Sequence, residues 1–201
     1  MSEFNVVKHN IFPTPLWIIK GTPQQLVDEL HQGAYFFKEK YQGVKISNQG
    51  GYQSPGFSWE EFHPVGKEYF KESISNVIKN PYEITGWWFN INPKDSWNLP
   101  HTHPQADFAL VWYLTDSDGL LTLMNDRPQR LIESGAESGH YMGVDAKKGD
   151  IVIFPADMHH YVLQNKRDTD RVCISLNIKC IGQPSIGTNT NTSDSRDHVL
   201  K

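Results

Sequence analysis

Residues 86–104 of the chain read GWWFNINPKDSWNLPHTHP, and residues 154–161 read FPADMHHY. The first stretch ends in His101 and His103, and the second contains His159 and His160. His159 and His160 come at the end of an apolar run that opens with Gly149 and Asp150, and many short apolar runs separated by turn residues are typical of barrels and sandwiches. The two stretches therefore predict a barrel with a metal ion held between them.

The composition is that of an ordinary globular domain. The chain has 201 residues, of which 38% are hydrophobic and 21% charged, and its formal net charge is -4. This length is enough for one domain with a real core. The net charge gives no electrostatic reason to expect nucleic acid, and no apolar run approaches the length of a membrane span. We therefore expect neither nucleic acid nor a membrane as partner.

The cysteines and the N-terminus predict a cytoplasmic protein. Cys173 and Cys180 are the two cysteines of the chain, and their spacing is not that of a metal-binding pair. The opening residues, MSEFNVVKHN, lack the charged-then-apolar layout of a signal peptide. Reduced thiols and an intracellular setting follow from both observations.

The first eighty residues predict strands followed by two helices. Residues 4–19 contain two short apolar runs broken by Pro13 and Pro15, and we expect strands there. Thr22 is a candidate helix cap, with Pro23 at the first helical position. Apolar residues at helical spacing continue this helix towards residue 41, and a second helix is expected over residues 66–79.

The rest of the chain predicts short strands. The expected ranges are 84–91, 108–114, 120–124, 150–154, 161–163 and 171–178, with Asp116–Gly119 as a hairpin turn. Residues 127–147 form a long polar segment, which predicts either a functional lid or a further strand. We expect a mainly β fold with flanking helices (α+β), one domain over residues 1–180, and a mobile tail over 181–201.

The histidines are candidate metal ligands. On a strand, His101 and His103 would face the same side, while one of His159 and His160 would face inward and the other outward. Imidazole suits iron, zinc, copper and nickel. The alternative is a solvated histidine pair in a polar loop, since HTHP lies between prolines.

Arg171 begins a strand on which Arg171, Cys173, Ser175 and Asn177 share one face. A guanidinium that faced the barrel interior would be costly to bury without a partner, and its strongest partner is a carboxylate. The neighbouring strands offer no acidic residue, so a bound dicarboxylate is favoured. The alternative is an outward arginine paired with Asp168 or Asp170.

These residues, in this order, resemble the iron(II)- and 2-oxoglutarate-dependent oxygenases, and within them a prolyl-hydroxylase-like subgroup. The resemblance extends over roughly residues 10–180. The motifs that carry it are Trp88-x-Asn90 leading to HTHP, VWYL at 111–114, GDIVIFP at 149–155 with its terminal histidine, RVCISLN at 171–177, and SNQGGYQS at 47–54.

The resemblance implies a distorted double-stranded β-helix, the jelly roll that cupins share, with Fe(II) and 2-oxoglutarate as cofactor and co-substrate. His101 and His160 would be catalytic iron ligands. Arg171 would bind the far carboxylate of 2-oxoglutarate with Ser175 and Tyr113, and Asn90 would belong to the same subsite. The implied reaction uses molecular oxygen to hydroxylate a C–H bond of a protein or peptide side chain, or of a small molecule, while 2-oxoglutarate becomes succinate.

One position departs from the family pattern. The usual ligand set is two histidines and a carboxylate, and the family places that acid two residues after the first histidine. Here this position is His103. Either His103 completes a set of three imidazoles, or water completes a two-histidine site, or Asp107 reaches the metal if the chain folds back near Pro104. We favour His103.

Two other functions compete with the oxygenase. A cupin-type metalloenzyme or metal-binding protein would use His101, His103, Asp107 and His160, because HTHPQAD fits the cupin pattern with Asp in place of Glu. That interpretation leaves Arg171 without a role. A binding module without catalysis would recognise a sugar or peptide through its aromatic residues, Trp87, Trp88, Trp97 and Trp112.

Overall fold

The computed structural model describes residues 14–125 and 141–182 of the chain. Three expectations lie wholly or partly outside these ranges. They are the first ten residues of the stretch 4–19 that was expected to form strands, most of the polar segment 127–147, and nearly all of the tail 181–201.

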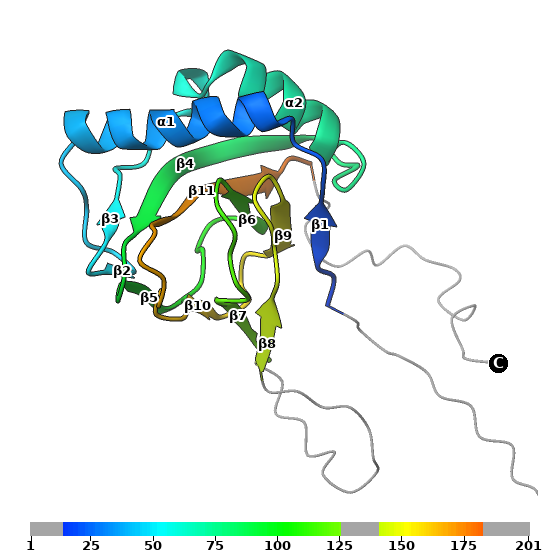
Figure 1. Ribbon diagram of the computed structural model, residues 1–201. Helices are drawn as coiled ribbons and strands as arrows, with labels where there is room; N and C mark the ends of the chain where they lie inside the picture. The colour runs from blue at the N-terminus through cyan, green and yellow to red at the C-terminus, as the bar shows by residue number, and fades with distance from the viewer. Residues whose placement is uncertain (1–13, 126–140, 183–201) are drawn as a thin grey trace, which may run out of the picture.

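Two antiparallel sheets face each other and form the barrel (Figure 1). The larger sheet has the order β1 (Trp17–Ile19), β9 (Ile151–Pro155), β6 (Phe108–Tyr113), β11 (Arg171–Cys180), β4 (Tyr82–Asn92) and β3 (Tyr52–Gln53). The smaller has the order β2 (Asn48–Gln49), β5 (Trp97–His101), β10 (His160–Val162), β7 (Leu121–Met124) and β8 (Tyr141–Val144). The prediction of a mainly β jelly roll with flanking helices is confirmed.

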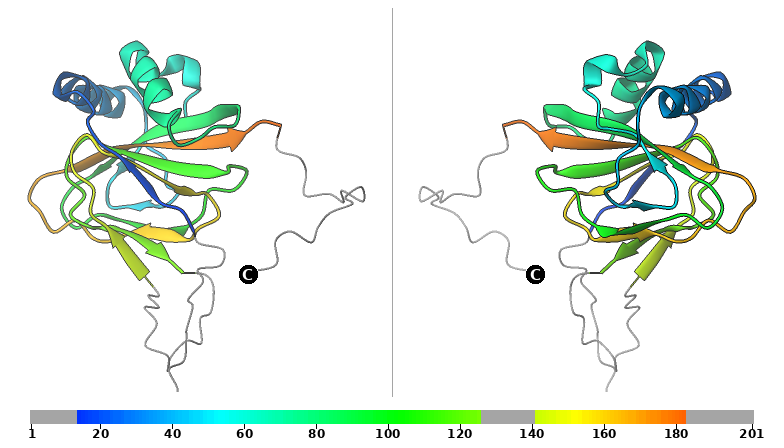
Figure 2. Two further views of the ribbon diagram at one scale, coloured as in Figure 1. Left: turned by 90° about the vertical axis from the view of Figure 1, so that its right-hand side faces the viewer. Right: turned by 90° about the vertical axis from the view of Figure 1, so that its left-hand side faces the viewer.

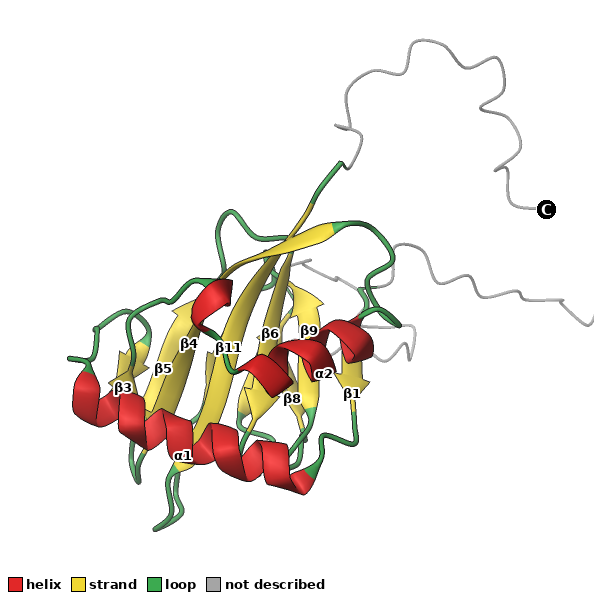
Figure 3. Cartoon of the chain, turned by 90° about the horizontal axis from the view of Figure 1, so that it is seen from above, coloured by secondary structure: helices red, strands yellow, loops and turns green. Residues whose placement is uncertain are grey.

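Two helices cover the outer face of the larger sheet, as seen from above in Figure 3 and from two sides in Figure 2. They are α1 (Gln24–Lys40) and α2 (Pro64–Ile74), and a short 3-10 helix (Trp59–Glu61) precedes α2. The core between helices and sheet is aromatic and aliphatic, with Phe70, Trp87 and Trp112 among its buried side chains. Burial of large apolar surface on both sides of the sheet fixes the strands that carry the site.

The helix termini differ from those expected. Thr22 does not cap α1: its hydroxyl donates to the carbonyl of Gly149 and accepts from the indole N–H of Trp112. It therefore ties the start of α1 to the sheet. The second helix ends at Ile74 and not near residue 79. The hydroxyls of Ser73 and Ser75 bond to carbonyls three residues earlier, a local contact that competes with helix continuation.

A second, smaller core lies inside the barrel, between the two sheets. Its buried members are Ala109, Tyr113, Leu121, Leu123, Val144, Ala146, Val152, Phe154 and Cys173. This core occupies part of the interior, and most of the remaining inward positions carry polar side chains. Those polar positions form the candidate site.

The turn at Asp116–Gly119 is present, but it does not make a hairpin. Asp118 and Gly119 both have positive φ, which suits a tight turn. The strands that flank it, β6 and β7, belong to different sheets. The turn therefore crosses from one sheet to the other, as a jelly roll requires.

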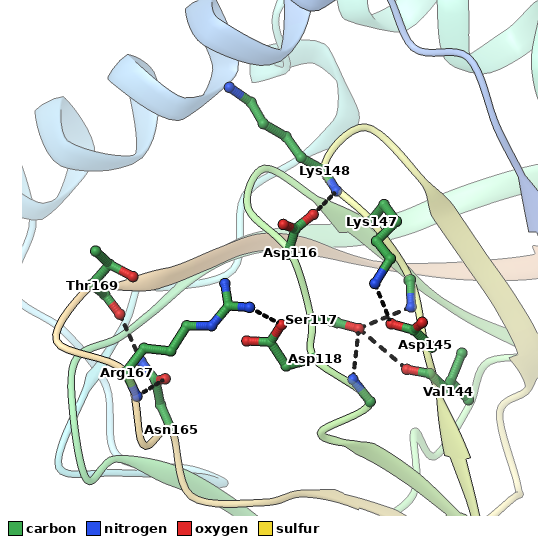
Figure 4. A network of polar contacts seen from close by, with 12 residues as sticks. Asp116, Ser117, Asp118, Val144, Asp145, Lys147, Lys148, Asn165, Arg167 and Thr169 are labelled. Atoms are coloured by element: carbon green, nitrogen blue, oxygen red, sulfur yellow. Dashed lines mark hydrogen bonds and ion pairs between the residues drawn. The ribbon is translucent and has the colours of Figure 1, made fainter.

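Polar contacts bind this turn to two neighbouring loops at one end of the barrel (Figure 4). The hydroxyl of Ser117 donates to the carbonyl of Val144 and accepts from the N–H of Ala146, at 3.2 and 2.9 Å. Asp118 forms an ion pair with Arg167 in the loop before β11. These contacts join the loops β6–β7, β8–β9 and β10–β11 at the end where Arg171 enters its strand.

Strands β2, β3, β5 and β8 complete the sheets. Strand β5 contains Pro100 and was not expected as a strand. Strand β8 lies within the polar segment 127–147, so the part of that segment that the structure describes includes a strand. The predicted strands elsewhere are confirmed to within a few residues. No helix among the described residues is long and apolar enough to cross a membrane.

Candidate metal centre and adjoining cavity

Three histidines converge inside the barrel mouth. One nitrogen from each of His101, His103 and His160 lies within 4.8 Å of the others, a grouping that can hold a metal ion. Their ring centroids are 4.3 Å apart for His101 and His160, 5.0 Å for His103 and His160, and 5.3 Å for His101 and His103. Among the described residues, no other cluster of three or more metal-binding side chains occurs.

A β-bulge aims His101 inward. Strand β10 pairs His160 with His101 and Val162 with Asn98, so β5 has one residue more than β10 between the two pairs. An extra residue reverses the direction in which the following side chains point, and bulges near active sites are a common way to re-aim a side chain. As a result Asn98 and His101 both face the cavity although three positions separate them.

His103 reaches the cluster by a different route from the one expected. The strand ends at His101, so the two histidines do not share a strand face. Instead the backbone N–H of His103 donates to the carbonyl of Ala156, 2.8 Å away, which holds the following turn against the β9–β10 connection. The ring of His103 is buried, with the ring of Trp88 packed beside it at a centroid distance of 5.6 Å.

His160 is the inward member of the second pair. It is buried in β10 between His101 of β5 and Leu123 of β7, whereas His159 is exposed. His159 lies just before the strand, and its backbone carbonyl accepts the N–H of Met124 at 2.8 Å. The pairing with β7 therefore continues past His160 and directs the two side chains to opposite faces.

Each of the three rings has its Nδ1 atom bonded to an oxygen. The partners are the carbonyl of Leu99 for His101, the side-chain oxygen of Asn177 for His103 and the carbonyl of Met158 for His160, at 2.6, 2.6 and 2.9 Å. Nδ1 is therefore occupied in every ring, and Nε2 is the atom left to face the cluster. A bond of this kind at the outer nitrogen is the usual way to orient a metal-binding histidine.

The three rings are neutral at physiological pH. Burial lowers the pKa of all three, to about 4 for His103 and about 3 for His160. For His160, proximity to His101 lowers the pKa further. Neutral imidazole is the form that binds a metal, so the site is ready for an ion without first losing protons.

A cavity of about 480 Å³, counted out to its open mouth, adjoins the histidines. Its lining contains the residues that the sequence analysis favoured for the site, namely Asn90, His101, His103, Tyr113, His160, Arg171 and Ser175. The other lining residues are Ser47, Trp88, Asn98, Val111, Leu121, Val162 and Cys173. No Asp or Glu is among these described lining residues, so Arg171 supplies the one formal side-chain charge.

Arg171 faces the cavity and not the solvent. It is 5% exposed, and its Nη1 atom is buried without a hydrogen-bond partner. The two acids that could have drawn it outward are engaged elsewhere: Asp168 pairs with Lys94, and Asp170 accepts a bond from Tyr35. A buried guanidinium nitrogen without a hydrogen-bond partner is costly, which favours an anion beside it.

Asn90 and Ser175 lie on adjacent strands next to Arg171. The amide of Asn90 donates to the hydroxyl of Ser175 at 3.1 Å, and the amide oxygen of Asn90 is buried without a partner. Tyr113 lies close to Arg171 and Cys173, and burial raises the pKa of its phenol, so its hydroxyl keeps its proton. This end of the cavity thus presents a cation and hydroxyl groups, a set suited to a carboxylate.

The structure places the other candidates outside the cluster. Asp107 is exposed, and its carboxylate accepts the backbone N–H of Cys180 at 2.6 Å. Trp87 and Trp112 are buried in the helix-side core, which removes them from any recognition surface. Trp88 lines the cavity, and Trp97 is 40% exposed.

Sequence reasoning missed a buried amide network beneath the site. The side-chain amide of Asn92 donates a hydrogen bond to the side-chain oxygen of Asn98 and accepts one from the amide of Asn48. The amide of Asn98 in turn donates to the hydroxyl of Ser47. Ser47 and Asn98 both line the cavity. No local signal marks these residues, because the bonds connect strands that are distant in sequence.

Comparison with known proteins agrees with this geometry. Residues 86–177 match the model of a protein family described as "Putative 2OG-Fe(II) oxygenase". The matched range extends from β4 to β11 and so contains all three histidines and Arg171. No curated protein sequence matches the chain at a significant level.

Solved structures share the fold at low sequence identity. HygX from Streptomyces hygroscopicus, in a structure with nickel and 2-oxoglutarate bound, is 14% identical, with 84% of each chain covered and a TM-score of 0.61. A prolyl-4-hydroxylase from Pseudomonas putida is 13% identical over 84% of this chain and 94% of its own, with a TM-score of 0.59. The epimerase SnoN from nogalamycin biosynthesis is 12% identical over 83% and 79%, with a TM-score of 0.63. By its family match over residues 86–177 and by its fold, the chain is similar to the 2-oxoglutarate- and Fe(II)-dependent oxygenases.

Proposed function

We propose that the chain is a hydroxylase that oxidises a C–H bond of a protein or peptide side chain, with conversion of 2-oxoglutarate to succinate. One observation carries the proposal. A single cavity joins three neutral imidazoles at one place to a buried arginine whose Nη1 atom has no partner at another, with no acidic side chain among its described lining residues.

The histidines fit a divalent iron ion. Three neutral nitrogens suit iron, and imidazole is a normal ligand for it. Two nitrogens that bind one ion at about 2.1 Å each lie at most about 4.2 Å apart. The three nitrogens lie within 4.8 Å of one another, so small side-chain rotations bring them to bonding distance. His101, His103 and His160 would hold the ion, and His103 would take the place of the family's carboxylate.

The charge of the cavity fits an anionic co-substrate. With a divalent ion bound by neutral ligands, the ion and Arg171 would both be positive. The described lining contains no acidic side chain, and Asp118, outside the lining, is the acid whose charge acts on Arg171. A dicarboxylate such as 2-oxoglutarate supplies two negative charges and can reach both. Arg171 would bind one carboxylate in the bidentate manner that guanidinium favours, with Ser175 and Tyr113 as hydroxyl donors.

Asn90 would complete this subsite. Its amide oxygen is without a partner, whereas its amide nitrogen bonds to Ser175. The oxygen and nitrogen of an amide exchange places by rotation about one bond. In the rotated form Ser175 donates to the oxygen, and the amide N–H groups face the cavity as donors to a carboxylate.

The protein's own part in the reaction would be to hold the metal ion, orient the co-substrate and shield the cavity from water. Bound iron and 2-oxoglutarate supply the oxidising power for C–H hydroxylation with molecular oxygen. The three histidines would hold the ion, and Arg171 would orient the co-substrate. Val111, Leu121 and Val162 add apolar surface to the lining, and apolar surroundings strengthen the polar contacts beside them.

A peptide substrate is supported by the resemblance to prolyl hydroxylases and by the prolyl-4-hydroxylase among the structural neighbours. Another neighbour, HygX, has been solved with hygromycin B bound, so this fold also accommodates small molecules. The half-buried Trp88 at the cavity would contact the substrate in either case.

We further propose the bounds of the catalytic domain and the cellular compartment of the protein. We place one catalytic domain within residues 1–180, followed by a tail over 181–201. Cys173 and Cys180 are free thiols, in agreement with a reducing cytoplasm.

The test is turnover of 2-oxoglutarate by the purified chain with Fe(II). Succinate is quantified by NMR, and proline-containing peptides are then screened by mass spectrometry for the addition of one oxygen atom. The matched control is His160→Ala, which should form no succinate. Hydroxylation of a small metabolite without any peptide product would redirect the substrate assignment.

A second measurement separates this function from a cupin-type metalloprotein. Calorimetry with Mn(II) in place of iron should show 2-oxoglutarate binding that depends on the metal. If Mn(II) binds and 2-oxoglutarate does not, the oxygenase proposal fails.

A further inference from the structure

The three histidines of the cluster differ in what holds their outer nitrogens. His101 and His160 are held by backbone carbonyls, those of Leu99 and Met158. A carbonyl oxygen only accepts hydrogen bonds, so Nδ1 of each ring must carry the proton. In a neutral ring the other nitrogen, Nε2, is then an unprotonated lone pair, which is the form that a metal requires.

His103 is held by a side chain instead. Its Nδ1 atom lies 2.6 Å from the Oδ1 atom of Asn177, a residue 74 positions away in the sequence. An amide can present either an acceptor or a donor, so the tautomer of His103 is not dictated by the backbone. If the amide nitrogen of Asn177 faced the ring, His103 would carry its proton on Nε2, pointing into the cluster.

We propose that Asn177 is the positioning residue for His103: its side-chain oxygen fixes the Nδ1–H tautomer and presents Nε2 to the other two histidines. The tautomer assignment stands on the hydrogen bond alone. Its consequence for metal binding rests on the function proposed above. His103 stands where the family pattern has an acid. The amide of Asn177 would therefore orient the one metal ligand in which this chain departs from that pattern.

The strand β11 places Asn177 for this role. Arg171, Cys173 and Ser175, at alternate positions before it, line the cavity, and Asn177 continues the same face. Opposite Asn177 on the flanking strands are Gly86 of β4 and Ala109 of β6. These residues have no side chain or a single methyl group, which leaves the amide room to reach His103.

Trp88 supports the same orientation from another side of the ring. Its ring centroid lies 5.6 Å from that of His103, and the ring of His101 lies 5.3 Å away. His103 therefore has aromatic neighbours that restrict its rotation, and the bond to Asn177 decides which nitrogen faces the cluster.

The tautomer can be measured directly. In the full chain labelled with 15N-histidine and freed of metal, long-range proton–nitrogen NMR at about pH 8, above the usual histidine pKa, distinguishes protonated from unprotonated ring nitrogens. We expect all three cluster rings to be Nδ1–H in the wild-type protein. Asn177→Leu removes the acceptor at similar side-chain volume. In this variant His103 should gain the Nε2–H form, while His101 and His160 should keep the Nδ1–H form. Asn177→Asp retains an acceptor and should restore the Nδ1–H form.

Metal affinity provides the second readout. Mn(II) should bind Asn177→Leu about 10- to 100-fold more weakly than wild type, the usual effect of losing such a partner, and Asn177→Asp should bind at least as tightly as wild type. A control is Asn80→Leu at an exposed asparagine, which should leave tautomers and affinity unchanged.

The outcomes separate the two proposals. Wild-type His103 in the Nε2–H form, or an Asn177→Leu variant with unchanged tautomer, overturns the role of Asn177. Should Asn177→Leu fail to fold, the wild-type and Asn177→Asp spectra still decide. If the wild-type protein has the expected tautomers but does not bind Mn(II), the proposed function is contradicted. The tautomer assignment remains supported in that case.

Discussion

His160 faces His101 across the pairing of β10 with β5, and their ring centroids lie 4.3 Å apart. The adjacent His159 is exposed. Because a strand points neighbouring side chains in opposite directions, the two consecutive histidines should differ completely in function. His160→Ala should abolish measurable Mn(II) binding in calorimetry, whereas His159→Ala should bind within about twofold of wild type. Equal losses in both variants would contradict the assignment of His160 to the metal.

Arg171 should control the co-substrate and not the metal. Its guanidinium is buried and has an unpartnered Nη1 atom at the cavity. Replacing Arg171 by Met keeps an apolar stem but removes the charged donors. Truncation of one partner of a buried charge pair typically costs about 2–5 kcal/mol. We expect Arg171→Met to weaken 2-oxoglutarate binding by at least about thirtyfold, while Mn(II) binding stays within a few-fold.

The matched control for Arg171 is Arg167, the neighbouring arginine whose ion pair with Asp118 lies outside the cavity. Exposed ion pairs contribute little to the stability of a fold, so Arg167→Met should leave the affinity for 2-oxoglutarate nearly unchanged. If both variants lose affinity equally, a general change of charge explains the result and Arg171 has no specific role.

Asp107 distinguishes the three-histidine site from a cupin-like ligand set. Its carboxylate is exposed and accepts the N–H of Cys180, and it is not a member of the histidine cluster. Asp107→Asn should therefore leave Mn(II) affinity within about twofold, while His103→Ala lowers it by a larger factor. Loss of metal in Asp107→Asn with retention in His103→Ala would restore the four-ligand cupin arrangement.

Much of this arrangement follows from local sequence pattern. The alternation along residues 171–177 correctly predicts that Arg171, Ser175 and Asn177 share a face, because a central antiparallel strand presents alternate residues to each side. The order of apolar runs and turns also predicts a β barrel with helices on one face. These are short-range signals, which depend on strand period and turn residues.

The remaining features depend on long-range geometry. Strand β5 contains a proline and a bulge, so its pattern does not resemble a strand, yet the bulge is what turns His101 inward. The contact of His103 with Asn177 joins residues 74 positions apart. Thr22 resembles a helix cap and instead bonds to Gly149 and Trp112, which lie 127 and 90 positions away in the sequence. No local period contains this information.

The buried histidines should make the metal-free protein sensitive to acid. In the unfolded chain their pKa is near 6.5, whereas burial lowers it to about 4 for His103 and about 3 for His160. Between these values the unfolded chain binds more protons, so the contribution to stability is full above about pH 6.5 and is lost as pH falls towards the folded pKa. Each pKa unit corresponds to about 1.4 kcal/mol, which gives a loss on the order of a few kcal/mol.

Urea unfolding of metal-free protein from about pH 7.5 to about pH 4.5 tests this dependence. A variant with His103→Gln and His160→Gln retains the carboxylates of the chain, so the difference between the two proteins isolates the histidines. We expect the free energy of unfolding to fall more steeply in wild type. Parallel curves would show that the rings titrate normally in the folded state.

The amide network beneath the cavity should be important for stability. Asn92 is fully buried, and its side chain accepts from Asn48 at 3.0 Å and donates to Asn98 at 3.1 Å. Asn92→Ala leaves both partners buried and unsatisfied, and each such group costs about 1–3 kcal/mol. We expect a loss of about 2–4 kcal/mol in urea unfolding, with an unchanged dependence on urea concentration.

The control for Asn92 is Asn80→Ala at an exposed position, where a change within about 0.5 kcal/mol is expected. The network also reaches the site, because Asn98 lines the cavity and its amide donates to Ser47. Freeing Asn98 should loosen the strand that ends at His101, so Asn92→Ala should weaken Mn(II) binding as well as stability. Lower stability with unchanged metal affinity would mean that the bulge in β5 alone is enough to hold His101 in place.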